Sequence, residues 1–184
     1  MLEIKQTEIE DVIVLEPAVF GDERGYFLES FSLERWTDLF ESAPAFVQDN
    51  ESMSQKDVLR GLHFQQEPYA QGKLVRVVKG AVLDVAVDIR SGSPTFGQHI
   101  KVKLTGENKK QAYIPPGFAH GFLTLEEDTI FSYKCTNYYN KESEGGLMWN
   151  DPDLNIDWGI DNPILSGKDS AYLRFCEFNS PFDY

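Results

Sequence analysis

The sequence predicts an all-β fold, a sandwich or barrel, in one domain that spans residues 1–184. Short runs of β-branched and aromatic residues follow one another along most of the chain, and Gly or Pro turns separate them. Only one stretch has the periodicity of an amphipathic helix. Hydrophobic residues make up 41% of the sequence, which is typical of a globular protein with a substantial core.

The first elements are short strands and a turn. Residues 2–6 alternate between apolar and polar side chains, and residues 12–15 form a β-branched apolar run, so both predict strands. Residues 20–29 contain Gly21 and Gly25, which flank a short polar segment that ends in Arg24. Glycines of this kind suit a tight turn, and the residues alone favour a plain hairpin with solvated charges.

Residues 32–43 form the one predicted helix. Leu33, Trp36 and Phe40 lie at helical spacing on one face, and Pro44 is expected to end the helix.

Residues 81–90 give the clearest strand. One face would hold only apolar side chains, whereas the opposite face would carry Asp84 and Asp88 among small apolar residues. Half-exposed strands usually place such carboxylates in solvent. The alternative is that they point into a polar barrel interior.

Further strands are predicted at residues 73–79, 98–104, 111–114, 120–125 and 129–139, and Gln48-Asp49-Asn50 is a polar segment before the strand that contains Arg60. The last segment carries Trp149 and Trp158, which predicts that it packs back on the β core.

Charge and composition exclude several classes of function. The net charge of −13 argues against general nucleic-acid binding, although a few arginines and lysines can still form a local site for a small anion. Cys135 and Cys176 have no metal-type spacing and are expected to be reduced thiols. No apolar run has the length of a membrane helix and no signal pattern starts the chain, so a soluble, cytoplasmic protein is expected.

The stretch Arg60-Gly61-Leu62-His63-Phe64-Gln65 places a histidine among β-type residues, and Lys73 follows on the next predicted strand. A half-buried imidazole titrates near neutral pH, and an ammonium beside it can stabilise a developing negative charge. Taken alone, this stretch favours a catalytic histidine and lysine no more than it favours the alternative, a structural histidine in the core and a solvent-exposed lysine.

A second motif, Pro115-Pro116-Gly117-Phe118-Ala119-His120, resembles the P-x-G-x-x-H motif of the cupin barrels. Metal-binding cupins also have an H-x-H pair, but here the corresponding stretch is His63-Phe64-Gln65. Two histidines without neighbouring carboxylate ligands make a poor divalent-metal site, so we expect no metal and no cofactor.

Several motifs occur together in one order: the 60–65 stretch with Lys73, PGFAHGF at 116–122, YKCTNYY at 133–139 and SGKD at 166–169. With the 20–29 turn, they make the chain similar to the dTDP-4-dehydrorhamnose 3,5-epimerase family over most of its length. The resemblance implies a cupin-type double-sheet jelly roll with one short N-terminal helix and small peripheral helices.

The resemblance also implies catalytic roles. Epimerisation beside a ketone removes a proton to form an enolate and returns one to the opposite face, which needs a base, an acid and an oxyanion partner. His63 corresponds to the base, Asp169 to the carboxylate that orients it, and Tyr133 to the acid. Lys73 lies nearest the enolate oxygen, and His120 lines the sugar pocket. Asp84 is the expected partner of His120, but this expectation rests on the strand-face argument alone.

The family pattern assigns a further set to the dTDP-sugar substrate: Arg24, Phe27, Glu29, Gln48, Asn50, Arg60, Lys73, Glu144 and Lys168, with Tyr139 stacked on the thymine. Tyr133 and Tyr139 share a strand face if no bulge intervenes; the alternative is two core aromatics. The family also implies a homodimer in which N-terminal strands cross between subunits.

Three alternatives stay open at this point. A 3- or 5-monoepimerase or a ketoisomerase would use the same scaffold. A non-catalytic sugar-nucleotide-binding cupin is disfavoured by the set of His63, Asp169, Tyr133 and Lys73, and a metal-dependent oxygenase is disfavoured by the missing H-x-H. The sequence does not determine which ring carbons are inverted, or in what order.

Overall fold

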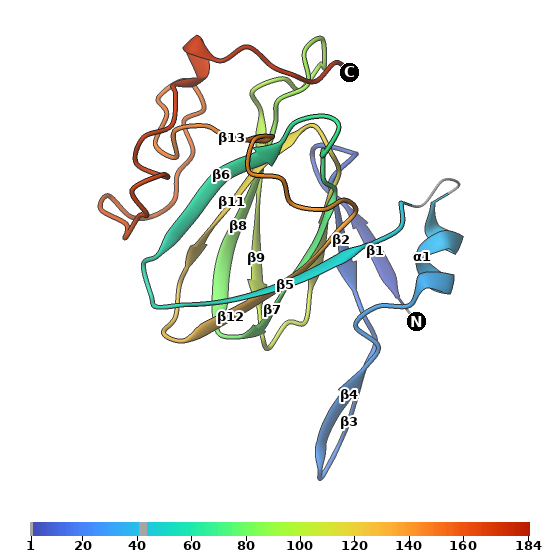
Figure 1. The fold of residues 1–184 in the computed structure, drawn as a ribbon. Helices are drawn as coiled ribbons and strands as arrows, with labels where there is room; N and C mark the ends of the chain where they lie inside the picture. Colours follow the sequence, from blue (N-terminus) through green and yellow to red (C-terminus); the bar gives the residue numbers. More distant parts are fainter. Residues whose placement is uncertain (1, 41–43) are drawn as a thin grey trace.

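The computed structural model describes residues 2–40 and 44–184, and in these residues two antiparallel β-sheets face one another (Figure 1). The six-stranded sheet has the order β1-β2-β10-β7-β12-β5, and the five-stranded sheet has the order β13-β6-β11-β8-β9. The strands of the two sheets are β1 Glu3–Gln6, β2 Ile13–Glu16, β5 Gln48–Ser54, β6 Leu59–Gln65, β7 Lys73–Lys79, β8 Ala81–Asp88, β9 His99–Thr105, β10 Gln111–Ile114, β11 Phe118–Thr124, β12 Thr129–Cys135 and β13 Glu144–Gly146. The predicted double-sheet, all-β fold is confirmed.

Strand β8 is largely buried on both faces, and each face belongs to a different core. Val85, Val87 and Ile89 belong to a core formed with the C-terminal segment, where Trp158 and Phe182 are buried. The other face, with Val82 and Ala86, belongs to the core between the two sheets. The predicted return of the tail onto the β core is therefore confirmed, and it covers the outer side of the five-stranded sheet (Figure 1).

The buried aspartates of β8 support the less usual interpretation of its polar face. Asp84 and Asp88 are both 0% exposed. Asp88 accepts hydrogen bonds from Arg90, Ser93 and Thr95 at the end of the strand. Asp84, which has no such loop around it, faces the interior of the sandwich next to His120.

The helix α1 spans Leu33–Leu39 and is shorter than predicted. Ser32 caps its start by accepting a hydrogen bond from the Arg35 backbone N–H. Phe40 already has extended dihedral angles, so the chain leaves the helix there, and its ring packs against that of Trp36 with the ring centroids 4.5 Å apart. The rest of the predicted helix, residues 41–43, lies outside the described residues. Small peripheral helices were also predicted. Within the described residues there is one, the 3-10 helix η1 at Phe175–Glu177.

Strands β3 Val19–Asp22 and β4 Gly25–Leu28 form a separate hairpin that projects away from the two sheets (Figure 1). Its turn carries Arg24, whose side chain pairs with Asp22 of the same hairpin. Phe20 is 63% exposed and Phe27 69% exposed. An isolated two-stranded hairpin is marginally stable in water, so these exposed aromatic side chains indicate a contact surface.

Cys135 and Cys176 are both free, as expected. Within residues 2–40 and 44–184, no helix has the length and apolar character needed to cross a membrane.

Candidate active site

A β-bulge brings Arg60 and His63 to the same side of β6. Residues three apart on a regular strand face opposite sides, but both of these side chains line one cleft between the sheets. His63 pairs with His120, and Arg60 pairs with Phe122, so two residues of β6 stand opposite one residue of β11. Gly61, inside the bulge, has φ 138°, and a Cβ there would lie 2.5 Å from the Cα of Gly121. Glycine at this position is therefore what allows the bulge.

His63 forms a close pair with Asp169. The distance from His63 Nε2 to Asp169 Oδ1 is 2.5 Å, and the second carboxylate oxygen accepts a hydrogen bond from Ser166 Oγ at 2.7 Å. Burial by itself raises the pKa of Asp169, but the hydrogen bonds from His63 and Ser166 outweigh burial and leave this pKa below its ordinary value. Asp169 is therefore an anion at neutral pH, held against one ring nitrogen of His63.

Tyr133 and Lys73 come from the opposite sheet. Tyr133 lies on β12 and Lys73 at the start of β7, and both line the cleft with His63. Burial raises the pKa of Tyr133, so the phenol keeps its proton at neutral pH. Burial also lowers the pKa of Lys73, and no described carboxylate lies within ion-pair distance of its Nζ. The cleft thus has an imidazole on one wall, a protonated phenol on the other, and an amine that is free to meet a substrate oxygen.

A second histidine–carboxylate pair lies beside the first. His120 Nε2 is 2.9 Å from Asp84 Oδ2, and both side chains are buried. This contact confirms the partner that the strand-face argument gave for Asp84. The other oxygen, Oδ1, has no hydrogen-bond partner among the described residues.

Five of the residues expected to hold the nucleotide, Gln48, Asn50, Tyr139, Glu144 and Lys168, are linked to one another at one side of the cleft. Tyr139 donates a hydrogen bond from its hydroxyl to Glu144 at 2.9 Å, and Lys168 forms an ion pair with the same carboxylate. Gln48 accepts a hydrogen bond from the Tyr139 backbone N–H and donates one to Asn50. These side chains therefore form one connected polar wall.

The strand argument for Tyr133 and Tyr139 is wrong, because β12 ends at Cys135 rather than at residue 139. Thr136 already leaves the sheet and bonds to Gly72 through its backbone N–H and its hydroxyl. Tyr139 reaches the cleft from the loop that follows.

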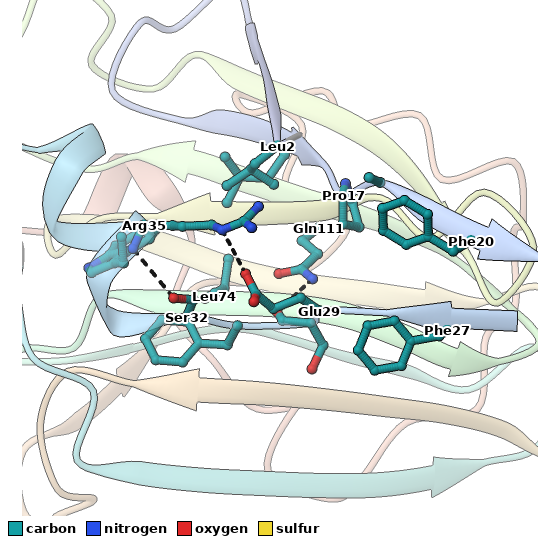
Figure 2. A pocket seen from close by; sticks show the side chains of 14 residues that line it. Leu2, Pro17, Phe20, Phe27, Glu29, Ser32, Arg35, Leu74 and Gln111 are labelled. Atoms are coloured by element: carbon teal, nitrogen blue, oxygen red, sulfur yellow. Dashed lines mark hydrogen bonds and ion pairs between the residues drawn. The ribbon is translucent and has the colours of Figure 1, made fainter.

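Three of the expected substrate-binding residues, Arg24, Phe27 and Glu29, do not reach the His63 cleft of their own chain. Arg24 lies on the projecting hairpin. Phe27 and Glu29 line a separate, largely apolar pocket at the root of the hairpin, where Glu29 pairs with Arg35 at 3.0 Å (Figure 2).

Other side chains of the cleft were not expected from the sequence. They are Ser52, Phe64, Gln65, Gln71, Phe122, Phe131 and Ser166. Two of them could have been found from the sequence. Ser52 lies two residues after Asn50 on β5 and so faces the same side of the strand, and Ser166 is the first residue of the SGKD motif.

Comparisons with known proteins agree with this geometry. A family model described as dTDP-4-dehydrorhamnose 3,5-epimerase matches residues 6–177. A relative of that name from Shigella flexneri is 55% identical, over 96% of this chain and 97% of its own length, and one from Escherichia coli strain K12 is 54% identical, over 96% of both.

Solved structures are similar as well. An RmlC epimerase from Legionella pneumophila Philadelphia 1, in complex with dTDP-4-keto-L-rhamnose, is 53% identical with a TM-score of 0.90, over 94% of this chain and 92% of that chain. ChmJ, a 3′-monoepimerase from Streptomyces bikiniensis in complex with dTDP-quinovose, is 34% identical with a TM-score of 0.89, over 93% and 87%. Fold and site therefore define a cupin-type sugar-nucleotide epimerase, an enzyme of the isomerase class. The chain belongs to the dTDP-4-dehydrorhamnose 3,5-epimerase family.

Proposed function

We propose that this chain converts dTDP-4-keto-6-deoxyglucose into dTDP-4-dehydro-L-rhamnose by inverting carbons 3 and 5, without a metal or cofactor, in the cytoplasm. The observation that carries the proposal is the pairing of a carboxylate-bound imidazole on one sheet with a protonated phenol on the other, in one cleft. Similar relatives bear the name of this activity, and the Legionella relative was solved with dTDP-4-keto-L-rhamnose.

The chemistry follows from the placement of these groups. The ketone at carbon 4 acidifies the C–H bonds on both of its neighbours, and His63 removes one such proton. The Asp169 carboxylate stabilises the imidazolium that forms, because it already holds one ring nitrogen. Lys73 stabilises the enolate oxygen, and Tyr133 returns a proton from the opposite face of the ring.

Binding of the nucleotide is assigned to the polar end of the cleft. Gln48, Asn50 and Lys168 face the dTDP group there, and Tyr139 stacks on the thymine. Arg60 reaches the diphosphate from the part of the cleft that it lines with His63. A guanidinium binds diphosphate oxygens well because its planar fork donates two hydrogen bonds. Glu144 holds both Tyr139 and Lys168, so one carboxylate positions the two.

The projecting hairpin supports a homodimer in which N-terminal strands cross between subunits. Arg24 and Phe27 are assigned to the substrate but lie outside the cleft of their own chain, and Phe27 is mostly exposed. Crossing would bury the exposed hairpin and bring these two residues to the cleft of the second copy.

Subunit complementation tests the crossing. Chains with His63→Ala and chains with Arg24→Ala and Phe27→Ala are coexpressed with different tags, and heterodimers are isolated. If strands cross, the heterodimer regains one intact site and about half of the parent activity per dimer. If both parental variants and the heterodimer are equally poor, each site is built from one chain and the crossing is wrong.

Proton NMR in deuterated water tests the function, with Tyr133→Phe as the deciding variant. The parent enzyme should label and invert carbons 3 and 5 of dTDP-4-keto-6-deoxyglucose. In Tyr133→Phe the enolate still forms, but the proton returns from His63 to its original face, so labelling should outrun inversion. Equal losses of labelling and inversion would mean that Tyr133 is needed to form the enolate. Because the similar ChmJ structure is that of a 3′-monoepimerase, label at carbon 3 alone would identify that activity instead.

A further inference from the structure

Tyr172 makes the closest aromatic contact to His63. Its ring centroid lies 5.7 Å from that of the imidazole, at an interplanar angle of 67°, which is an edge-to-face arrangement. The hydrogen bond that Asp169 accepts fixes one atom of the imidazole, but the terminal torsion of a histidine has a broad energy minimum. A second contact on the ring therefore restricts the plane of the imidazole further.

The same tail segment supplies both contacts. Asp169 and Tyr172 are three residues apart, in a turn where the Ala171 N–H donates to the Lys168 carbonyl. Just beyond, the Met148 N–H donates to the Leu173 carbonyl, which ties the segment to the chain after β13. The position of Tyr172 is therefore fixed on both sides by backbone hydrogen bonds.

Gly146 provides the space for the Tyr172 ring. Gly146 is paired with His63 across β13 and β6, and a Cβ at this glycine would lie 2.4 Å from Cζ of Tyr172. The backbone of Gly146 is outside the left-handed region, so its conformation would accept alanine. Only the aromatic ring requires glycine here, which is a built contact rather than a chance neighbour.

The hydroxyl of Tyr172 does not explain the contact. Its oxygen is buried and makes no hydrogen bond of good geometry among the described residues. Lys168 lies near enough to lower the pKa of Tyr172, but burial outweighs this effect and raises that pKa to about 12. Substrate in the cleft cannot reach this oxygen, and Tyr172 does not line the cleft. What remains for function is the ring itself.

We propose that Tyr172 is a positioning residue, whose ring holds the His63 imidazole in the plane that points its free nitrogen at the substrate carbon. The inference rests on the proposed role of His63 as the base. It assigns the ring, and not the hydroxyl, to the reaction.

The experiment compares Tyr172→Leu with Tyr172→Phe, using turnover of dTDP-4-keto-6-deoxyglucose, calorimetric dTDP affinity and thermal unfolding. Tyr172→Leu should lower kcat roughly 2- to 12-fold, the worth of one edge-to-face contact, at unchanged dTDP affinity. Tyr172→Phe should keep the parent kcat and an equal or higher Tm, because it removes an unpartnered buried hydroxyl. Phe175→Leu, in the same tail but with its ring on Phe96, is the matched control and should behave like the parent.

Gly146→Ala gives an independent arm, since its new methyl group should displace the Tyr172 ring and lower kcat. In the Tyr172→Leu background the same change should add little, as expected for two residues that act through one contact. The His63 imidazole resonances should shift in Tyr172→Leu while those of His99 and His120 stay in place.

Parent-like kcat in Tyr172→Leu would overturn the proposal, as would equal losses in the Leu and Phe variants. A fall in Tm and dTDP affinity that matches the loss of kcat would make Tyr172 merely structural. A parent enzyme that neither labels nor inverts the sugar would instead refute the proposed function, so the two failures are distinguishable.

Discussion

The two histidine–carboxylate pairs stand side by side, yet they are built differently. His63 and His120 are direct partners on β6 and β11 and line the same cleft. The His120 side chain is 7% exposed, its carboxylate comes from the adjacent strand β8, and it stacks on Phe131. The His63 side chain is 26% exposed, and its carboxylate comes from the C-terminal segment.

This difference indicates that the His63 imidazole takes part in the reaction, whereas the His120 imidazole is a structural part of the cleft wall. A base needs a free nitrogen that substrate can reach and a partner that stabilises its charge after proton transfer. His63 has both, and the second oxygen of Asp169 is held by Ser166. His120 is enclosed in the sheet, and Asp84 leaves one oxygen without a partner, an arrangement that disfavours repeated changes of charge.

The largest effect should come from His63→Ala. Removal of the base should lower kcat by ~10²–10⁴-fold while dTDP affinity stays nearly constant, because Arg60 and Tyr139 remain. His120→Ala should cost less in turnover and more in Tm, since it leaves a cavity and an unpaired carboxylate. Equal losses of kcat in the two variants would contradict the assignment of His63 as the base and of His120 as a structural residue of the cleft wall.

The carboxylates should show the same asymmetry at a smaller scale. Asp169→Asn should lower kcat by at least about 100-fold, because the imidazolium loses its counter-charge and the base loses the group that orients it. Asp84→Asn should leave kcat within a few-fold of the parent, because the amide can still bond to His120 and this pair does not carry the proton. Steady-state kinetics on both variants would decide, and a large loss in Asp84→Asn would assign proton transfer to the second pair.

Arg60→Ala should act on binding rather than on chemistry, although Arg60 lies on the same strand as His63. Loss of a charge-assisted contact to the diphosphate should weaken dTDP binding by about 1.5–3 kcal/mol. Isothermal titration calorimetry with dTDP measures this. Unchanged affinity would show that Arg60 serves its own fold, through the hydrogen bond that it donates to Ser54 at 3.1 Å.

Chelation should have the smallest effect, namely none. Each of the two cleft histidines already uses Nε2 on a carboxylate, and no H-x-H pair is present. Exhaustive EDTA treatment should leave turnover unchanged, and elemental analysis should find no stoichiometric metal. If removal of a metal abolished activity and its return restored it, the proposal that the reaction needs no metal would be wrong.

Local alternation made part of this site predictable from sequence. Asp84 followed from the period of two along β8, because a carboxylate among small apolar residues on one face indicated a polar interior. The motifs around His63, His120 and Asp169 carried the rest of the catalytic set through family resemblance. Their contacts now appear as short distances between elements far apart in the chain.

Other features depended on tertiary structure. The bulge at Gly61 reverses the face of Arg60 relative to His63, and a period of two cannot show it. The end of β12 at Cys135 was invisible because the following residues are also good strand formers. Tyr172 had no motif around it, and its role emerges only from Gly146, which lies opposite His63 on a neighbouring strand.

The tail that completes the His63 pair has a consequence for the order of events during folding. His63 and Asp169 are separated by 106 positions, whereas Asp84 and His120 are separated by 36. Closing the longer loop costs more chain entropy, and such contacts tend to form late. We therefore expect the Asp84–His120 pair to form when β8 and β11 pair, and the His63–Asp169 pair to form only after the C-terminal segment docks. Catalytic activity should therefore appear only after the C-terminal segment has docked. During refolding from denaturant, turnover should recover more slowly than the circular dichroism signal of the β-sheets.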